Sequence, residues 1–345
     1  MISRISIIAA AGLAALAGCA PVGPVGPVGD QASLESDATG ALFVAGKFGN
    51  TLARIDLATG RETARVASCA NPHELATSPD GAHVALACYG GTTLDIFRTG
   101  DLAKVTSIEL GENARPHGIV WHANGDLFAT AEGRKSVFWV KYPLGEAETF
   151  EYGSGQDGTH MLVVSPDARH AWTTDLGSKT VTRIDLLTRR APQSVEVGIE
   201  PEGIALSGDG ATLYVSARGS DEVYAIAPQS MEVRRTIPVG DFPLRIAIRP
   251  QGDFAVTSDL ADGALSVIDL RSGTVARQIA VSSRDEAQER FQVTILWSPD
   301  GERIYVAETG TDTIAEVDFS TGKVLRRFSG GDGGDGLAIL GGADG

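Results

Sequence analysis

Three histidines recur at one position of a repeated sequence pattern. His73 and His117 each follow a proline, and His160 follows Thr159 at the corresponding place. Imidazole is a common ligand for zinc, copper and iron, and three imidazoles from consecutive repeats could converge on one ion. The alternative is structural, because a ring in this position could instead hydrogen-bond to the backbone of the neighbouring repeat. His73, His117 and His160 are therefore candidates for a divalent-metal or haem-like cofactor site, and the structural role stays open beside it.

Polar residues form a second recurring set, near the expected end of the second strand of each repeat. With one residue of slack, the set is Lys47, Cys88, Glu132, Asp175, Arg218, Asp259 and Glu308. Asp175, Asp259 and Glu308 could supply general acid or base chemistry, as in a lactone hydrolase, and the two aspartates could add oxygen ligands to a metal. Arg218 could bind an anionic ligand or cofactor, or pair with Glu202 or Asp259. A solvated acidic rim without a catalytic role is the alternative.

Short strands must position these side chains, because the chain repeats one order of elements. Each copy holds a strand, a Ser-Pro-Asp-Gly turn or variant, a second strand, a glycine-containing turn, a third strand ending near Ile-Asp, a Thr-Gly turn and a fourth strand. Copies spaced by 44, 43, 42, 42 and 49 residues begin at Pro72, Pro116, Thr159, Pro201, Pro243 and Gln292. Four short strands in about 40 residues is the period of a β-propeller blade. The sequence therefore predicts an all-β fold.

The two ends of the repeated region complement each other. The first copy begins at a second strand, residues 41–44, and its missing first strand appears at residues 336–340. Pairing of these segments would complete blade one and remove an exposed sheet edge. We expect residues 40–345 to form a seven-bladed β-propeller closed by its C-terminal strand. The first strand of each blade would line the central channel, with the histidines at its mouth.

Two strands carry the pattern of a known repeat. They read Leu213-Tyr214-Val215-Ser216 and Ile304-Tyr305-Val306-Ala307, and residues 201–207 read Pro-x-Gly-Ile-Ala-x-Ser. The chain resembles bacterial YVTN-repeat (YncE-like) seven-bladed propeller lipoproteins, and more distantly lactonase-type and haem-d1-type propellers. We expect a binding or scaffold protein for a small ligand, cofactor or protein partner at the channel mouth. The alternatives are a lactonase-like hydrolase, a metal-dependent oxidoreductase and a haem-d1-type chaperone, so enzymatic activity is left open.

The N-terminal residues have the features of an export signal. Arg4 precedes an apolar stretch over residues 5–17, which is too short for a stable transmembrane helix. The stretch ends in Leu16-Ala17-Gly18-Cys19, which resembles the lipobox of bacterial lipoproteins; an ordinary signal peptide is the alternative. We predict a signal peptide over residues 1–18, then a lipidated Cys19 and Pro-Val-Gly spacer over residues 19–39. The resemblance to Gram-negative sorting patterns implies a periplasmic protein anchored to the outer membrane.

Two further cysteines flank one expected hairpin. Cys69 and Cys88 fall at the same end of that hairpin, so a disulfide is geometrically reasonable. An exported protein folds in an oxidising compartment, which favours the bond. Two free thiols are the alternative.

The net charge limits the partners. The formal charge is −15 at pH 7, and nucleic acid requires a positive path along its phosphates. We therefore expect no nucleic-acid partner. The protein is expected to be a monomer that meets the membrane only through its lipid anchor.

Two other features have expected structural roles. Trp121 and Trp297 occupy equivalent first-strand positions and are expected to pack between blades. Residues 282–290 form an insertion before the seventh copy and are expected to be an exposed loop on the face of the channel mouth.

Overall fold

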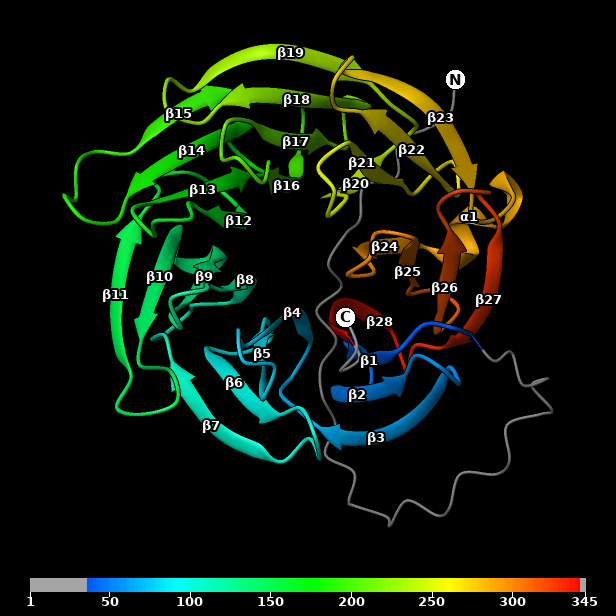
Figure 1. Ribbon diagram of the computed structural model, residues 1–345. Helices are drawn as coiled ribbons and strands as arrows, with labels where there is room; N and C mark the ends of the chain where they lie inside the picture. Colours follow the sequence, from blue (N-terminus) through cyan, green and yellow to red (C-terminus); the bar gives the residue numbers. More distant parts are fainter. Residues whose placement is uncertain (1–35, 342–345) are drawn as a thin grey trace, which may run out of the picture. The chain divides into compact units, whose positions relative to one another are not determined.

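Seven four-stranded antiparallel sheets stand around a central axis in the computed structural model, which describes residues 36–341 (Figure 1). Adjacent strands within each sheet are hydrogen-bonded in the order expected for propeller blades. The predicted all-β, seven-bladed propeller is therefore confirmed. The predicted signal peptide, Cys19 and the spacer as far as residue 35 lie outside the described residues.

In each of the first four blades the strands follow one another from the innermost to the outermost. Blades 1 and 2 are β28 (Gly334–Gly341), β1 (Gly40–Gly46), β2 (Thr51–Asp56) and β3 (Arg61–Ala67), then β4 (Pro72–Thr77), β5 (His83–Cys88), β6 (Thr93–Arg98) and β7 (Lys104–Glu109). Blades 3 and 4 are β8 (Pro116–Trp121), β9 (Leu127–Ala131), β10 (Ser136–Lys141) and β11 (Glu148–Gly153), then β12 (Thr159–Val164), β13 (His170–Asp175), β14 (Thr180–Asp185) and β15 (Gln193–Glu196). A short 3-10 helix, η1 (Glu132–Arg134), follows β9.

The last three blades repeat the same order. Blade 5 is β16 (Pro201–Leu206), β17 (Leu213–Ala217), β18 (Glu222–Ala227) and β19 (Glu232–Pro238). Blades 6 and 7 are β20 (Pro243–Ile248), β21 (Phe254–Asp259), β22 (Ala264–Asp269) and β23 (Thr274–Ala280), then β24 (Gln292–Trp297), β25 (Arg303–Glu308), β26 (Thr313–Asp318) and β27 (Val324–Ser329).

The C-terminal strand closes the ring. β28 pairs antiparallel with β1, with Leu340 opposite Ala41 and Leu337 opposite Val44. The predicted pairing of residues 336–340 with residues 41–44 is therefore confirmed. Because β28 pairs with β1 in blade 1, the edge of β1 that faces β28 is not left without hydrogen-bond partners.

Apolar side chains hold the blades together at their interfaces. One cluster of buried apolar residues lies between each pair of adjacent blades. Trp121 belongs to the cluster between blades 2 and 3, and Trp297 to the cluster between blades 6 and 7, which confirms their predicted packing role. No blade could shield both of its apolar faces alone, so the ring is the stable unit.

A repeated backbone irregularity positions the inner strands. In every blade the inner strand carries one extra residue against its partner, as between Pro72 and Leu75, which face Cys88 and Leu86. Such a β-bulge turns side chains out of the regular alternation. A residue with positive φ precedes each inner strand; these seven residues are Asn71, Arg115, Gly158, Glu200, Phe242, Phe291 and Gly333. Turn and bulge together aim the next two side chains at the channel.

The insertion before blade 7 is a helix, so the expected loop was wrong. α1 (Arg284–Arg290) begins at Ser283, whose side chain accepts from the Glu286 backbone while Glu286 accepts from the Ser283 backbone. This reciprocal capping box satisfies two free donors of the first turn. Within residues 36–341, no helix has the length and apolar character that crossing a membrane requires.

Candidate functional site

Seven side chains occupy the position just after the turn in each inner strand, at the mouth of the channel. In blade order they are Asp335, His73, His117, His160, Glu202, Leu244 and Val293, and all are buried. Asp335 was missed by the sequence analysis. Alignment of Gly334-Asp335-Gly336-Leu337 with Pro72-His73-Glu74-Leu75 would have found it, because the closing strand supplies the inner strand of blade 1.

The structure brings the three predicted histidines together in one row, with adjacent rings tilted by 59° and 35°. The ring centroids of His73 and His117 lie 4.8 Å apart, and those of His117 and His160 lie 3.8 Å apart. Burial lowers the pKa of His73 to about 4 and the pKa of His117 well below its ordinary value. Both rings are therefore neutral at pH 7, which is the form that binds metals.

The backbone fixes the tautomer of His73. Nδ1 of this ring donates a hydrogen bond of 3.0 Å to the carbonyl oxygen of Asn71. A neutral ring with its proton on Nδ1 keeps a free lone pair on Nε2. Asn71 lies in the segment just before the same strand, so this is not the bond to a neighbouring blade that the structural alternative expects.

His160 interacts with two carboxylates. Its Nδ1 donates to Oε1 of Glu132, and its Nε2 lies 3.5 Å from Oε1 of Glu202. Burial opposes a charge on this ring, but the interactions with Glu132 and Glu202 raise its pKa above the ordinary value. Tyr89 donates a hydrogen bond of 2.7 Å to the other oxygen of Glu132 and stacks on His73 with centroids 4.4 Å apart. Tyr89 was also missed by the sequence analysis.

His117, Glu132 and His160 form a set that could hold a metal ion. One ligand atom from each lies within 4.8 Å of the others. Nδ1 of His117 is buried and has no hydrogen-bond partner among residues 36–341. A buried polar atom without a partner is uncommon in native proteins and requires an explanation, such as an ion. Glu132 was recognised in the sequence as a recurring polar residue but not as a ligand.

A charged network lies beside the histidines. Arg245 donates from Nη1 to Oε1 of Glu202 at 2.6 Å and from Nη2 to Oε1 of Glu74 at 2.8 Å. The pKa of Glu202 lies well below its usual range because hydrogen bonding and the nearby positive charges outweigh burial. Lys47 pairs with Asp335 at 2.8 Å. Glu74 and Arg245 fall on the residue after each mouth position, a channel-facing place that only the bulge creates.

Arg218 forms an ion pair with Glu202, one of the two carboxylates expected as its partner. Its Nη1 donates to Oε2 of Glu202, and its Nε lies 3.2 Å from Oε2 of Glu200. Asp259 is not among its ion-pair partners in the described part of the chain. The guanidinium therefore already neutralises protein carboxylates at the mouth.

The expected rim position of Asp175, Asp259 and Glu308 is wrong. These residues pair with the first residue of their inner strands and are buried. Lys47, Glu132 and Arg218 lie one residue further along in their blades. A shift of one residue along a strand moves a side chain to the opposite face. Because the predicted set allowed an uncertainty of one residue, it combined side chains from both faces.

The three carboxylates have hydrogen-bond or ion-pair partners within the protein. Thr182 and Thr180 donate to Asp175 at 2.6 and 3.0 Å, and Ser266 donates to Asp259 at 2.6 Å. Arg327 pairs with Glu308 at 2.9 Å. Burial raises the pKa of Asp175 to about 6 and the pKa of Asp259 to about 7. All three carboxylates are buried and already bonded to protein groups, so their placement does not support the hydrolase alternative.

The remaining two mouth positions are apolar. Leu244 and Val293 form a small cluster with Leu260, and Phe242 packs against it. This cluster is separate from the seven interfaces between blades. The mouth is therefore divided into a titratable part over blades 1–5 and an apolar part over blades 6 and 7.

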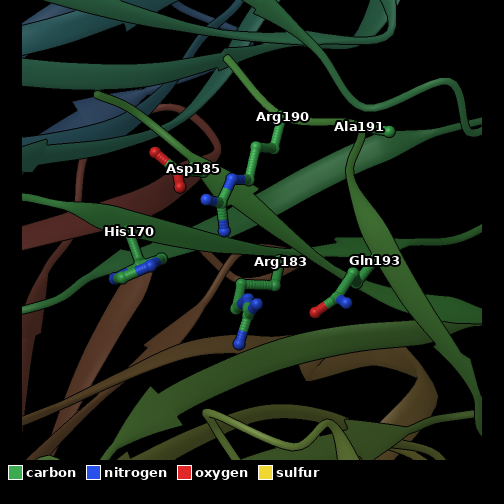
Figure 2. A pocket seen from close by; sticks show the side chains of 6 residues that line it. All are labelled: His170, Arg183, Asp185, Arg190, Ala191 and Gln193. Atoms are coloured by element: carbon green, nitrogen blue, oxygen red, sulfur yellow. The ribbon is translucent and has the colours of Figure 1, made fainter. Parts of the chain in front are cut away.

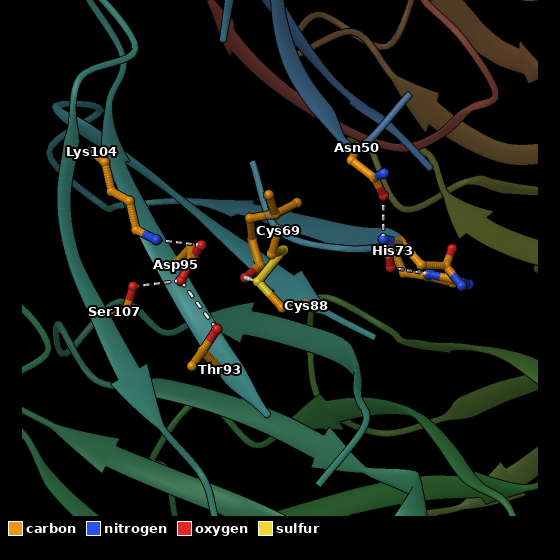
Figure 3. Close-up of a disulfide and its surroundings, with 10 residues drawn as sticks. Asn50, Cys69, His73, Cys88, Thr93, Asp95, Lys104 and Ser107 are labelled. Carbon is orange, nitrogen blue, oxygen red and sulfur yellow. Dashed lines mark hydrogen bonds and ion pairs between the residues drawn. A yellow bond between two sulfur atoms is a disulfide. The ribbon is translucent and has the colours of Figure 1, made fainter. Parts of the chain in front are cut away.

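Cys69 and Cys88 form a disulfide with Cα atoms 5.6 Å apart (Figure 3). Cys88 is the residue before Tyr89 and pairs in register with Pro72, the residue before His73. The bond therefore braces the segment that presents Tyr89 and His73 to the channel. Asp95 lies near the disulfide but is paired with Lys104 at 2.7 Å.

Blade 4 contains a pocket, whose lining side chains are drawn in Figure 2. It is lined by His170, Arg183, Asp185, Arg190, Ala191 and Gln193. His170 pairs with Asp185 at one end of β13 and β14, whereas Asp175 and Thr180 pair at the other end, near the mouth. Arg183 donates to the carbonyl oxygen of Gln229, so one of its donors is already used. The pocket is not part of the histidine site.

Comparisons with known proteins support the fold. No known family matches the chain in a family-level comparison. A 147-residue segment is 29% identical to a seven-bladed β-propeller protein of Mycobacterium tuberculosis; it covers 39% of this chain and only 35% of that protein. A functionally unknown protein from Desulfotomaculum acetoxidans has a similar structure, with a TM-score of 0.73, 13% identity, and coverage of 88% of this chain and 100% of the other.

An enzyme structure also shares the architecture. A dihydro-heme d1 dehydrogenase solved in complex with DHE matches with a TM-score of 0.64, 15% identity, and coverage of 88% of this chain and 68% of the other. Identities this low carry the fold and not the activity. The chain is a seven-bladed β-propeller.

Proposed function

We propose that this protein is an exported, non-catalytic propeller that binds one divalent transition-metal ion at the channel mouth. The observation that carries the proposal is the convergence of His117, His160 and Glu132, with ligand atoms within 4.8 Å of one another. The unpartnered Nδ1 of His117 supports it, since a bound ion would satisfy that buried atom. His73, whose ring centroid lies 4.8 Å from that of His117, is a candidate for a further ligand.

The donor set indicates the class of ion. Two imidazoles and one carboxylate suit zinc, copper(II) or nickel better than magnesium or calcium, which prefer sites made of oxygen ligands. Bonds of about 2.1 Å in a tetrahedral site place ligand atoms roughly 3.4 Å apart. The ligand atoms need to move by only about an ångström, and the ion would replace the proton between His160 and Glu132. Three protein ligands leave one position open to water or an external ligand.

The packing of the histidines favours an ion over a macrocycle. His117 lies between His73 and His160, and only 3% of it is exposed. A haem-like cofactor needs a wide, flat space beside its axial nitrogen, whereas a single ion needs only a gap between ligand atoms. The residues present do not fit a haem, and we propose no haem-dependent step.

Zinc binding tests the proposed site directly. Wild-type protein, stripped with a chelator, should bind one equivalent of zinc in a competition titration. His117→Ala and His160→Ala should each weaken binding by more than about 100-fold, beyond the range typical of changes outside the ligand shell. His170→Ala is the matched control, because His170 lies outside the row of three histidines; this variant should bind zinc as the wild type does. Equal zinc affinity in all four proteins, or no binding by the wild type, would refute the site.

We also propose that the protein is periplasmic and held at the outer membrane by lipid on Cys19. The sequence Leu16-Ala17-Gly18-Cys19 supports this location, as does the disulfide between Cys69 and Cys88, since disulfides persist in oxidising compartments. Cys19→Ala should abolish incorporation of labelled palmitate and move the protein from the membrane fraction to the soluble periplasmic fraction. Unchanged fractionation would argue against the anchor.

A further inference from the structure

We infer that Glu202 is a positioning residue for the proposed metal site: it holds Nε2–H of His160, so that Nδ1 of the same ring faces the ion. This inference rests on the proposed function and adds to it a residue that does not itself bind the ion. The two edges of the His160 ring face different carboxylates.

The two carboxylates have different places relative to the ligand set. Nδ1 of His160 contacts Glu132, which lies in the cluster with His117. Nε2 lies on the other edge of the ring, 3.5 Å from Oε1 of Glu202. This distance is longer than a good N–H···O hydrogen bond. An ion between Nδ1 and Glu132 would separate that pair, and movement of the ring toward Glu202 would shorten the second contact.

Glu202 is held firmly enough for this role. Arg245 contacts one of its oxygens at 2.6 Å and Arg218 contacts the other. Only 4% of Glu202 is exposed. A carboxylate held by two guanidinium groups in a buried place has little freedom to rotate, so its direction toward His160 is set before the ion arrives.

A carboxylate behind a histidine ligand has a known physical effect. It accepts the hydrogen bond of one ring nitrogen, which fixes the tautomer and makes the other nitrogen a better ligand. In this site, loss of Glu202 would remove the preference for a proton on Nε2. The ring could then keep its proton on Nδ1, bonded to Glu132, and Nδ1 would be lost as a ligand.

Glu74 provides a matched control within the same network. Like Glu202, it is a buried glutamate, and it contacts the other terminal nitrogen of Arg245 at 2.8 Å. Its ion pair within residues 36–341 is with Arg245, not with His160. Glu74→Gln therefore disturbs the same arginine, but it leaves in place the Glu202 carboxylate that lies 3.5 Å from Nε2 of His160.

The experiment measures zinc affinity in wild type, Glu202→Gln and Glu74→Gln, with circular dichroism to verify folding. Glu202→Gln should weaken zinc binding by about 10- to 100-fold, the usual cost of losing such a carboxylate, whereas Glu74→Gln should stay close to wild type. Glu202→Asp keeps the charge but withdraws the carboxylate, and it should also weaken binding. It replaces the glutamine variant if that variant does not fold.

A second readout separates this inference from the metal proposal. The ring ¹⁵N shifts of His160 in ion-free protein should change in Glu202→Gln and not in Glu74→Gln. If the wild type binds zinc and both variants bind it equally well, the positioning role is refuted while the metal site stands. If the wild type binds no zinc, the proposed function fails, and unchanged ¹⁵N shifts in Glu202→Gln would then refute the positioning role as well.

Discussion

The channel mouth has two parts that share one backbone and differ in chemistry. Blades 1–5 place Asp335, His73, His117, His160 and Glu202 at the bulge, whereas blades 6 and 7 place Leu244 and Val293 at the same position. The register shift is the same in all seven blades. The scaffold therefore provides the positions, and the side chains alone decide where a polar site forms.

The comparison also shows how buried charge is tolerated. In the titratable part, the carboxylates of Glu202, Glu74 and Asp335 are matched by Arg245, Arg218 and Lys47. Asp259, buried inside blade 6, accepts hydrogen bonds from the hydroxyl groups of Thr257 and Ser266 and forms no ion pair within residues 36–341. The pKa of Glu202 is lowered and the pKa of Asp259 is raised, although both are buried. Glu74 shares Arg245 with Glu202, yet burial still raises the pKa of Glu74. Glu202 has a second arginine and His160 as partners, and its pKa is lowered.

The largest effect is expected from removal of the central cation. Arg245→Met should lower the free energy of unfolding by about 3–5 kcal/mol, because Glu74 and Glu202 would both lose a buried partner. Urea denaturation at pH 7 measures the change. Arg284→Met is the control, since Arg284 forms an exposed ion pair with Asp262. Equal effects of the two substitutions would show that the buried ion pairs of Arg245 contribute no more to stability than an exposed pair does.

Loss of the disulfide should have the next largest effect. The double substitution of Cys69 and Cys88 by serine opens a loop with a sequence separation of 19 residues. The expected loss is about 3 kcal/mol by the loop-entropy relation. Comparison of urea midpoints of the oxidised wild type and the variant measures it. An unchanged midpoint would show that the segment before Tyr89 does not need this brace.

Asp259 should make stability depend on pH. Because folding raises its pKa from 3.8 to about 7, the folded chain holds this proton more tightly than the unfolded chain does. Stability should therefore fall as the pH rises from about 4 to 7 and then level off. Asp259→Asn should reduce the fall between pH 5 and pH 8 by about 2–3 kcal/mol. Thermal unfolding of both proteins across this range measures the effect; parallel curves would contradict the raised pKa.

The smallest effect is expected in the apolar part of the mouth. Leu244→Ala should lower the free energy of unfolding by about 2 kcal/mol, the low end for a buried leucine, because its cluster is small. Zinc affinity should not change, since Leu244 contributes no ligand. Parallel zinc and urea titrations check both points. A large loss of zinc affinity would show that the two parts of the mouth are coupled.

The periodicity of the sequence predicted the ring because it depends on many residues at once. Turn residues and strand lengths recur in every copy, so the blade number and the pairing of residues 336–340 with 41–44 followed without a structure. The same alignment placed His73, His117 and His160 in equivalent positions. These predictions needed only the repeat length, which single substitutions hardly disturb.

The site could not be completed in the same way because side-chain direction changes with every residue. A slack of one residue was enough to place Asp175 and Glu132 in one set, although one is buried in its blade and the other meets His160. The bulge adds a second channel-facing position, which brought in Glu74 and Arg245. A bulge has no clear signature in the sequence here. The helix α1 was missed for a different reason: Ser283-x-x-Glu286 is a capping-box sequence, but the polar composition of residues 282–290 was interpreted as a loop.

Anomalous diffraction from a crystal soaked in zinc tests the central claim most directly. We predict one strong peak among His117, His160 and Glu132, with metal–ligand distances of about 2.0–2.2 Å, and Nε2 of His160 bonded to Glu202. A mouth without a peak, in crystals whose wild-type protein is intact and zinc-saturated, would contradict it. So would a zinc ion bound only at residues outside the seven inner strands.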